Sequence, residues 1–325
     1  MRTLVTGGAG FIGSHLVDAL VDRGHACTVL DDLSRGDRSN LAHHGDAVTF
    51  VHGSVTDRDL VHDVARDADA VLHLASVVGV RSTIADPTRV IDVSVRGTAN
   101  VVDAAPTGAA LLVASSSEIY GRSPEVPYDE QTPGVIGAPD VARWSYAHAK
   151  ACSEHLALAA GRTRSRPPAV VRYFNVYGPR MPRTIDPSVV ARFLDAARVG
   201  EPLRLHEGGR QTRNFVYVDD AVEATLAALE LASGRVVNLG GPLESSISDL
   251  AHLITKVTGS SSEVVSVPDP ASAAGAFEDP ARRSATGALA ASLLGWEPTT
   301  PLEDGLTRSW ESWTAGLDEL RPVTR

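Results

Sequence analysis

The sequence predicts an α/β protein that is built on a doubly wound parallel sheet and followed by a smaller α/β domain. Short apolar segments alternate with amphipathic helical patterns through the first half of the 325-residue chain. This alternation is typical of βαβ units, whose right-handed crossovers place helices on both faces of a sheet. A glycine-rich segment also joins the first apolar segment to the first helical pattern, as in nucleotide-binding sheets.

The apolar patterning predicts the elements in order. Strands are expected at 3–6, 26–30, 48–51, 70–74, 109–114 and 169–172, and helices at 11–23, 58–66, 88–105 and 145–161. Further along, helices are expected at 188–199, 221–231 and 248–258, and strands at 202–205, 216–218 and 236–239. Residues 1–178, with a returning segment near 208–235, are expected to form one domain, and residues 179–325 mainly the other. Residues 259–285 are expected to form a surface excursion.

The composition argues against several classes of protein. A hydrophobic content of 43% is enough for a large core, and a net charge of -10 disfavours nucleic-acid binding. No apolar run has the length of a membrane span, and the start of the chain lacks a leader pattern. The only two cysteines, Cys27 and Cys152, predict no disulfide framework. We therefore expect a cytoplasmic protein with no nucleic-acid or membrane partner, and no metal site is predicted.

The glycine-rich segment reads TGGAGFIG from residue 6. Gly7 permits a tight turn, Gly10 permits close approach of a pyrophosphate, and Gly13 permits close packing of helix on strand. The N-terminus of the following helix offers free N–H groups to phosphates. Asp31, at the end of the second strand, can accept both ribose hydroxyls and would repel a 2′-phosphate. The sequence therefore predicts a Rossmann-type site for NAD, with Asp32 as an alternative to Asp31.

A tyrosine and a lysine are placed on one face of a later helix. Tyr146 and Lys150 are four residues apart. An ammonium group beside a phenol is expected to lower the phenol pKa, which would make Tyr146 a base for a sugar hydroxyl. Lys150 is also expected to donate to the nicotinamide ribose. The chain has 30 basic residues, of which only Lys150 and Lys256 are lysines, so lysine at position 150 indicates a specific role.

Five segments occur in the order found in the extended short-chain dehydrogenases. They are residues 6–13, 115–121, 146–150, 172–179 and 211–220. The chain resembles the nucleotide-sugar epimerases, dehydratases and decarboxylases of that family from residue 2 to about residue 255. The resemblance implies a Rossmann domain with tightly bound NAD, a smaller domain for a UDP-sugar, and a homodimer formed through a four-helix bundle.

The resemblance also implies roles for individual residues. Ser116 is expected to complete a catalytic triad with Tyr146 and Lys150 at the carboxyl end of a strand. Further contacts to the cofactor are expected from Phe11, Ile12, Leu74 and Ala75. Contacts to the substrate are expected from Ser117, Arg143, Asn175, Arg180 and Arg213, and an arginine fork such as that of Arg213 suits diphosphate oxygens. Ser94 and Gly53-Ser54 depart from the family pattern on the cofactor side.

Two positions favour one branch of the family. Glu118 is expected to be catalytic, because the segment Ser116-Ser117-Glu118 resembles the Thr-Ser-Glu of UDP-glucuronic acid decarboxylases. Dehydratases have aspartate where this chain has Ser117. Arg143, three residues before the tyrosine, also resembles the decarboxylases. The resemblance therefore implies oxidation at C4 and loss of C6 as carbon dioxide, which would give UDP-4-keto-pentose, UDP-xylose or both. A UDP-sugar or UDP-uronate 4-epimerase is the alternative.

The segment after Pro179 departs from the decarboxylase pattern. The decarboxylases continue with an Asn-Asp-Gly-Arg-like loop, whereas this chain has Pro182-Arg183-Thr184-Ile185-Asp186-Pro187. Arg183 is a candidate to replace the missing arginine. We expect this change to alter hydride return, so that keto product or NADH leaks from the enzyme. A non-catalytic NAD-binding regulator is a third possibility, but it would require a broken triad.

Overall fold

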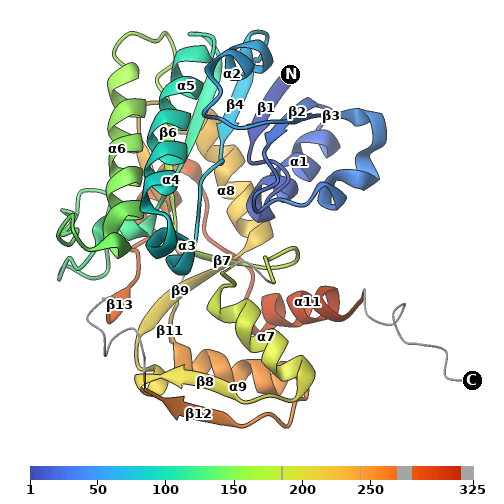
Figure 1. Cartoon of the computed structure of the whole chain (residues 1–325), viewed down its shortest axis with the longest axis vertical. Helices are drawn as coiled ribbons and strands as arrows, with labels where there is room; N and C mark the ends of the chain where they lie inside the picture. The colour runs from blue at the N-terminus through green and yellow to red at the C-terminus, as the bar shows by residue number, and fades with distance from the viewer. Residues whose placement is uncertain (184–185, 242, 269–279, 316–325) are drawn as a thin grey trace, which may run out of the picture.

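A seven-stranded, fully parallel sheet forms the upper part of the computed structural model (Figure 1). The structure describes residues 1–183, 186–241, 243–268 and 280–315. The strand order is β10-β6-β5-β4-β1-β2-β3. The strands are β1 (Arg2–Thr6), β2 (Ala26–Asp31), β3 (Val48–His52), β4 (Ala70–His73), β5 (Ala110–Ser116), β6 (Ala169–Tyr173) and β10 (Val236–Leu239). This order is that of a Rossmann sheet with one added edge strand, so the predicted fold class is confirmed.

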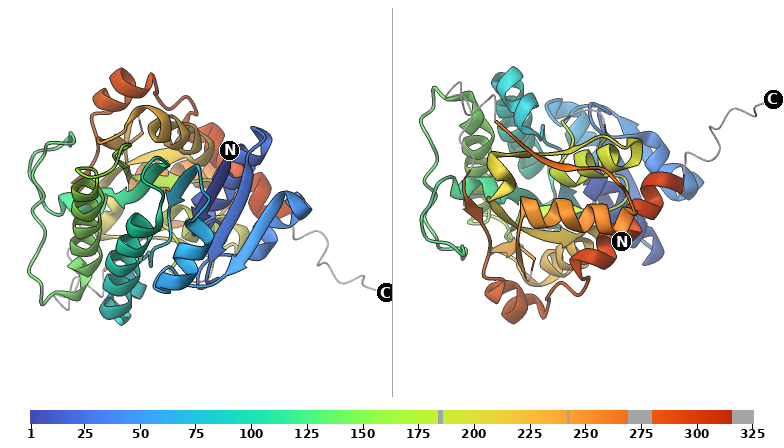
Figure 2. Two further views of the ribbon diagram at one scale, coloured as in Figure 1. Left: turned by 90° about the horizontal axis from the view of Figure 1, so that it is seen from above. Right: turned by 90° about the horizontal axis from the view of Figure 1, so that it is seen from below.

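Two layers of helices cover this sheet, as the view from above shows (Figure 2). Helices α1 (Phe11–Asp22) and α8 (Val218–Leu231) contact each other on one face. The other face carries α2 (Arg58–Ala65), α5 (Gly97–Ala104) and α6 (Ser145–Ala160). Successive strand residues point to opposite faces, so Val5 packs in the cluster with α1 while Leu4 packs in the cluster with α2. Burial on both faces explains why the central strands β4 and β5 are apolar along most of their length, whereas the edge strand β3 is only partly buried.

The segment expected to be one helix at 88–105 is interrupted. It consists of α4 (Pro87–Ile91), a π-helical turn η2 (Asp92–Arg96) and α5. The carbonyl of Ser94 accepts hydrogen bonds from the hydroxyls of Thr98 at 2.6 Å and Ser153 at 2.9 Å. The two hydroxyl groups thus satisfy a carbonyl oxygen in the widened helical turn. Single π-helical turns of this kind are frequent at functional sites.

The lower part of the molecule contains two smaller sheets. In one, β9 (Thr212–Tyr217) pairs with β7 (Asn175–Tyr177), β11 (Glu244–Ser246) and β13 (Arg282–Arg283). In the other, β8 (Leu203–His206) pairs with β12 (Val264–Val267). The helices of this part are α7 (Val189–Val199), α9 (Ile247–Thr258) and α11 (Leu302–Ala315). Residues 259–285 are therefore not only a surface excursion, since they supply β12 and β13, although 269–279 lie outside the described residues.

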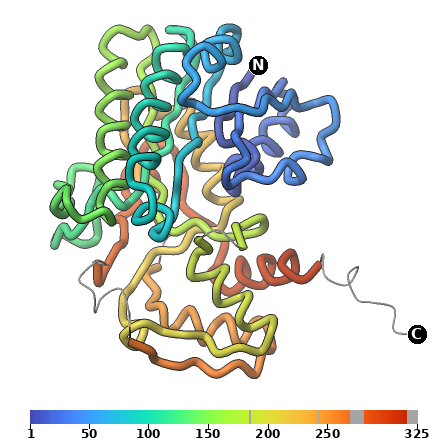
Figure 3. The backbone as a smooth tube through the Cα atoms, in the orientation of Figure 1, coloured from blue at the N-terminus to red at the C-terminus, as the bar shows by residue number. Residues whose placement is uncertain are grey.

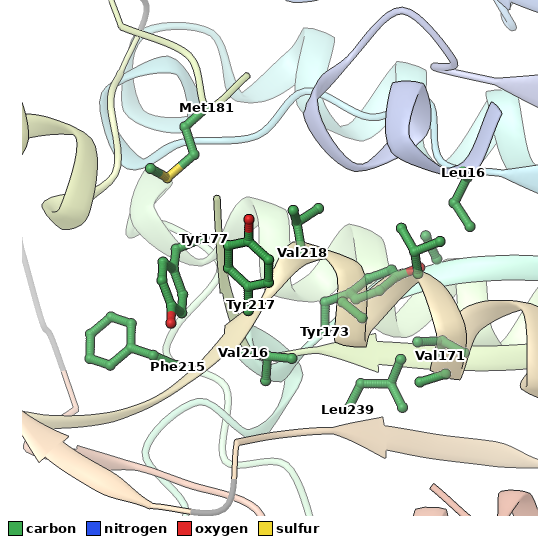
Figure 4. Close-up of a cluster of buried hydrophobic side chains, with 14 of the residues drawn as sticks. Leu16, Val171, Tyr173, Tyr177, Met181, Phe215, Val216, Tyr217, Val218 and Leu239 are labelled. Carbon is green, nitrogen blue, oxygen red and sulfur yellow. The ribbon is translucent and has the colours of Figure 1, made fainter. Parts of the chain in front are cut away.

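The chain links the two parts by crossing between them, and β9 leads back into α8 on the large sheet (Figure 3). At the crossing, aromatic side chains from β7 and β9 continue the core of the large sheet (Figure 4). Tyr177 packs edge-on against both Phe215 and Tyr217. This shared core holds the two parts together beside the carboxyl ends of the large sheet. Within the described residues, no helix is long and apolar enough to cross a membrane.

Candidate active site

A cavity of about 1160 Å³ lies between the large sheet and the lower part. Its walls include the carboxyl ends of β1, β2, β4 and β5, which is where open parallel sheets bind ligands. Nearly all of the predicted site residues line it. They are Gly7, Gly10, Phe11, Ile12, Gly13, Asp31, Leu74, Ala75, Ser116, Ser117, Glu118, Arg143, Tyr146, Lys150, Asn175 and Arg213. Arg180 is the one predicted site residue that does not line the cavity.

The glycine loop shapes one end of this cavity. Gly7 has φ +72°, and a Cβ on it would lie 2.8 Å from the backbone nitrogen of Ala75. A Cβ on Gly13 would lie 2.1 Å from the carbonyl oxygen of Gly7. Gly10 caps α1 without any side-chain hydrogen bond, so the first N–H groups of this helix keep their capacity for an external acceptor. The loop therefore fits a pyrophosphate at a helix N-terminus.

Asp31 lies beside the loop and is almost fully buried. Its two carboxylate oxygens accept the backbone N–H groups of Ala9 at 3.0 Å and Leu33 at 2.8 Å. Burial raises the pKa of Asp31, although both hydrogen bonds oppose this. Each carboxylate oxygen has a second lone pair, so Asp31 can also accept ribose hydroxyls. Asp32 lines the same cavity but is turned toward Arg89, at 3.6 Å.

The phenol of Tyr146 lies among hydroxyl groups. The side chains of Ser116 and Ser76 hydrogen-bond to it. Burial raises the pKa of Tyr146 above its usual range, and the charge of Glu118 raises it further. The net shift is therefore opposite to the lowering expected from Lys150, whose Nζ atom lies 5.9 Å from the centre of the Tyr146 ring. The sequence spacing places both side chains on one face but does not fix where the ammonium group points.

Lys150 is buried and bonded to the sheet. Its Nζ atom donates to the carbonyl oxygen of Ala114 on β5 at 2.8 Å. Burial lowers the pKa of Lys150 to about 8, against the opposing charge of Glu154. The Glu154 carboxylate lies one helical turn further along α6 and accepts hydrogen bonds from the Nη2 and Nε atoms of Arg172 at 2.7 and 2.9 Å. The lysine is thus fixed at the cavity wall with part of its capacity to donate still available.

Glu118 lies between two arginine side chains. Its Oε2 atom accepts from Arg143 at 2.7 Å, and its Oε1 atom accepts from Arg283 at 2.6 Å. Burial opposes ionisation, but the charges of Arg283 and Arg143 outweigh it and lower the pKa of Glu118 to about 2. Glu118 comes from a short helix after β5, η3 (Ser117–Tyr120), and Arg143 comes from η4 (Ala142–Trp144) just before α6. The carboxylate is therefore ionised at neutral pH and acts as a hydrogen-bond acceptor.

Sequence reasoning missed two residues that contact Glu118 and Tyr146. Arg283 belongs to the segment interpreted as a surface excursion, yet it is buried and lines the cavity. Ser76, which hydrogen-bonds to Tyr146, was not singled out although it follows Leu74 and Ala75 directly. The strand before Ser76 gave a usable signal, because residues just past a parallel strand reach the ligand edge of the sheet. The sequence around Arg283 contains no pattern that indicates a position at the ligand edge of the sheet.

The lower part contributes a basic wall. Arg213 lines the cavity and donates to the carbonyl oxygen of Pro280 at 2.9 Å, and Asn175 donates to the carbonyl oxygen of Asn214 at 2.8 Å. Arg192 and Arg210 also line this wall. Their charges suit the diphosphate of a nucleotide ligand.

The two arginines after Pro179 lie elsewhere. Arg180 forms an ion pair of 2.7 Å with Asp18 of α1, outside the cavity, which places it away from the expected substrate contact. Arg183 donates to the carbonyl oxygen of Trp313 at 2.7 Å and stacks on its ring at 4.1 Å. It does not replace the arginine missing from the decarboxylase-like loop.

The cofactor-side departures both lie near the predicted NAD site. Gly53 and Ser54 line the cavity. Ser94 is buried, and its hydroxyl contacts the hydroxyl of Ser76 at 3.1 Å. Ser94 therefore reaches Tyr146 indirectly, through the hydrogen bond of Ser76.

Comparisons with solved structures agree with this geometry. The UDP-glucose 4-epimerase of Thermotoga maritima, solved with UDP-glucose, is 30% identical, with a TM-score of 0.89 over 98% of this chain and all of that one. The UDP-glucuronic acid 4-epimerase of Bacillus cereus, solved with UDP-glucuronic acid and NAD, is 27% identical, with a TM-score of 0.84 over 99% of this chain and all of that one.

Comparisons of sequence identify relatives along nearly the whole chain. A UDP-N-acetyl-α-D-glucosaminuronate decarboxylase of Bacillus cytotoxicus is 37% identical over 94% of this chain and 95% of that protein. UDP-glucuronic acid decarboxylase 1 of Xenopus tropicalis is also 37% identical, over 95% of this chain and 71% of that protein. Residues 3–240 match the model of the NAD dependent epimerase/dehydratase family. With the glycine loop, the Tyr–Lys helix and the sheet order in place, this chain belongs to that family, and NAD is its cofactor.

Proposed function

We propose that this protein converts UDP-glucuronic acid to a UDP-pentose by oxidation at C4 and decarboxylation at C6. The observation that carries the proposal is the ionised Glu118 carboxylate, held by Arg143 and Arg283 in the same cavity as Tyr146. Relatives that are 37% identical are named as decarboxylases of UDP-linked uronic acids. A 4-epimerase needs no proton donor at C5, whereas a decarboxylase does, and this charged group provides a place to hold one.

The first step takes place at the C4 hydroxyl. Tyr146 accepts the hydroxyl proton, and Ser116 hydrogen-bonds to the same sugar oxygen, because both side chains already meet in the cavity. NAD⁺, held by the glycine loop and Asp31, would supply the hydride acceptor for C4, and its positive charge would favour the phenolate of Tyr146. Lys150 orients the cofactor ribose from the wall formed by β5. The product is a 4-keto sugar whose C6 carboxylate is β to the new carbonyl group.

The second step breaks the bond between C5 and C6. The electron pair of that bond moves into the C4 carbonyl group as carbon dioxide leaves, and Tyr146 and Ser116 hydrogen-bond to the enolate oxygen. C5 then takes a proton from a water held by Glu118. Arg143 and Arg283 stabilise the hydroxide that remains until solvent protonates it. Glu118 itself is too acidic to be the donor at neutral pH.

The remaining residues are assigned to binding. Residues 1–178, with the returning segment, hold the cofactor, and residues 179–325 mainly hold the nucleotide sugar. Arg213 and Asn175 bind the diphosphate, with Arg192 and Arg210 on the same wall. Arg180 is not assigned to the substrate, because it pairs with Asp18.

A direct experiment separates decarboxylation from 4-epimerisation. The enzyme is incubated with UDP-glucuronic acid and NAD, and the products are examined by mass spectrometry. Loss of one carbon dioxide is expected, and a new sugar of unchanged mass would overturn the proposal in favour of 4-epimerisation. UDP-N-acetylglucosaminuronic acid is tested in parallel, because one relative is named for that substrate. NMR of the products then tests whether the keto-pentose leaks from the enzyme. UDP-xylose as the single product, without any keto-pentose, would exclude such leakage.

We also propose that the protein acts as a homodimer in the cytoplasm. Cys152, His155 and Ala159 are exposed on α6 at positions i, i+3 and i+7, so they lie along one exposed face of this helix. A paired α5–α6 surface from two copies would make a four-helix bundle. Light scattering coupled to gel filtration is expected to give twice the chain mass, and a monomeric mass at micromolar concentration would contradict this.

A further inference from the structure

Three metal-binding side chains meet outside the active-site cavity. Asp18 belongs to α1, and His43 and His44 belong to η1 (Arg38–Ala47), which packs beside it. The Nε2 atoms of His43 and His44 lie 3.1 and 2.8 Å from the same Asp18 oxygen, Oδ1. All three ligand atoms are within 4.8 Å of one another. Among the residues that the structure describes, no other group of three such side chains comes this close.

The environment of Asp18 prepares its carboxylate for such a role. The second oxygen, Oδ2, is bound by Arg180 at 2.7 Å, so only Oδ1 is presented to the two imidazoles. Metal-bound carboxylates are commonly fixed by an outer partner of this kind. The His44 side chain is 7% exposed and the His43 side chain 52%, which leaves an open side for water or another ligand.

We propose that Asp18, His43 and His44 bind one divalent transition-metal ion of the Zn²⁺ class. Two imidazole nitrogens and one carboxylate oxygen suit Zn²⁺, Co²⁺ or Ni²⁺, whereas Mg²⁺ and Ca²⁺ prefer sites made of oxygen alone. A metal ion placed between the Asp18 carboxylate and the two imidazole rings would need only a small shift of each ring. Each hydrogen bond would then be replaced by a metal–nitrogen bond. Water completes the coordination on the exposed side.

The place of the site in the fold gives it a structural role. The backbone N–H of Asp37 and the side-chain amide of Asn40 both donate to the carbonyl oxygen of Ala9, each at 3.0 Å. Ala9 lies in the glycine loop, so η1 supports that loop from outside the cavity. A metal ion would fasten η1 to α1 at its other end. Neither Asp18 nor either histidine lines the cavity, so the ion is not a participant in the chemistry at C4.

The test measures metal binding by the whole, untagged enzyme after treatment with a chelator. Titration calorimetry with Zn²⁺ is expected to show one ion per chain, and Co²⁺ is expected to give the visible absorption of a low-coordinate site. His43→Ala and His44→Ala are each expected to weaken Zn²⁺ binding by at least about tenfold. His62→Ala is the matched control, because His62 contacts Asp103 at 3.1 Å without a second histidine.

Two outcomes would overturn the proposal. One is the absence of saturable Zn²⁺ binding at micromolar concentration, which would show a hydrogen-bonded cluster only. The other is binding that survives the combined His43→Ala and His44→Ala change. Asp18→Asn adds a variant that keeps the side-chain shape, and NAD binding by each variant verifies that it is folded. Thermal unfolding is expected to shift upward with Zn²⁺ in the parent protein and not in the double variant.

Discussion

The Arg283 guanidinium donates to the Glu118 carboxylate at 2.6 Å across 165 positions of sequence. Arg143 donates to the other carboxylate oxygen at 2.7 Å. Two positive charges therefore surround one negative charge, and the group carries a net positive charge beside Tyr146. This balance determines the ionisation of Glu118, and it makes Arg283 the first residue to change in testing the proposed chemistry.

Arg283→Gln is expected to lower the kcat for carbon dioxide release by about a hundredfold or more, because the hydroxide left at C5 protonation loses one of its two guanidinium partners. NAD binding should be unchanged, since the glycine loop is untouched. The matched control is Arg282→Gln, which removes the exposed neighbour that pairs with Glu244. Equal loss of activity in both variants would mean that the change disturbs β13 and not the chemistry.

Glu118→Gln is expected to destabilise the protein by roughly 3 to 5 kcal/mol at neutral pH, because it leaves two buried guanidiniums without their anion. The pKa of Glu118 is lowered from 4.5 to about 2, so its contribution is present above 4.5 and is lost as the pH falls toward 2. Urea unfolding of parent and variant should therefore give free energies that converge between these pH values. If the difference in free energy of unfolding between parent and variant stays constant with pH, the result would contradict the pairing of Glu118 with the two arginines.

The alkaline side of the pH–rate profile is expected to depend on Lys150. Burial lowers the pKa of Lys150 to about 8, so its ammonium form, and with it the rate, should decline above that pH. Lys150→Arg keeps a charge at all accessible pH values but places it less well, so a rate roughly a hundredfold lower with no alkaline decline is expected. An unchanged decline in the variant would assign that pKa to another group.

Gly13→Ala is expected to weaken NAD binding by at least about tenfold. The new Cβ would lie 2.1 Å from the carbonyl oxygen of Gly7, so the loop must move away from α1. Fluorescence titration with NADH measures the effect. Gly108→Ala is the control, because Gly108 is exposed and the only atom near its added Cβ is the Ser165 hydroxyl, at 3.9 Å.

Local patterns in the sequence were sufficient for the large sheet and its cofactor loop. The strands from β1 to β5 are short, largely apolar segments that alternate with helical patterns, so chain order indicates the architecture. The π-helical turn at 92–96 could not be predicted in this way, because the hydrogen bond that Ser153 of α6 donates to the Ser94 carbonyl is a tertiary contact. The sequence pattern also said nothing of contacts such as that between Asp18 and His44, which join two elements through side chains alone.

The site was predictable where residues share a strand end or one helix face. Ser116, Tyr146 and Lys150 line the same cavity for that reason. Arg180 and Arg183 failed as expected ligands because the chain after Pro179 turns toward α1 and α11, a direction set by tertiary packing. Arg283 was missed because its partner is fixed only when β13 pairs with β9.

The late position of Arg283 determines the order in which the active site is completed during synthesis. The glycine loop, Asp31, Tyr146 and Lys150 all lie within the first half of the chain, and domains fold progressively from the N-terminus as they leave the ribosome. The last strand of the large sheet, β10, ends at Leu239. A nascent chain can therefore complete its cofactor-binding sheet before residue 283 has been added. The charge balance around Glu118 can be established only after residue 283 has been added, when the cofactor-binding sheet already has all of its strands.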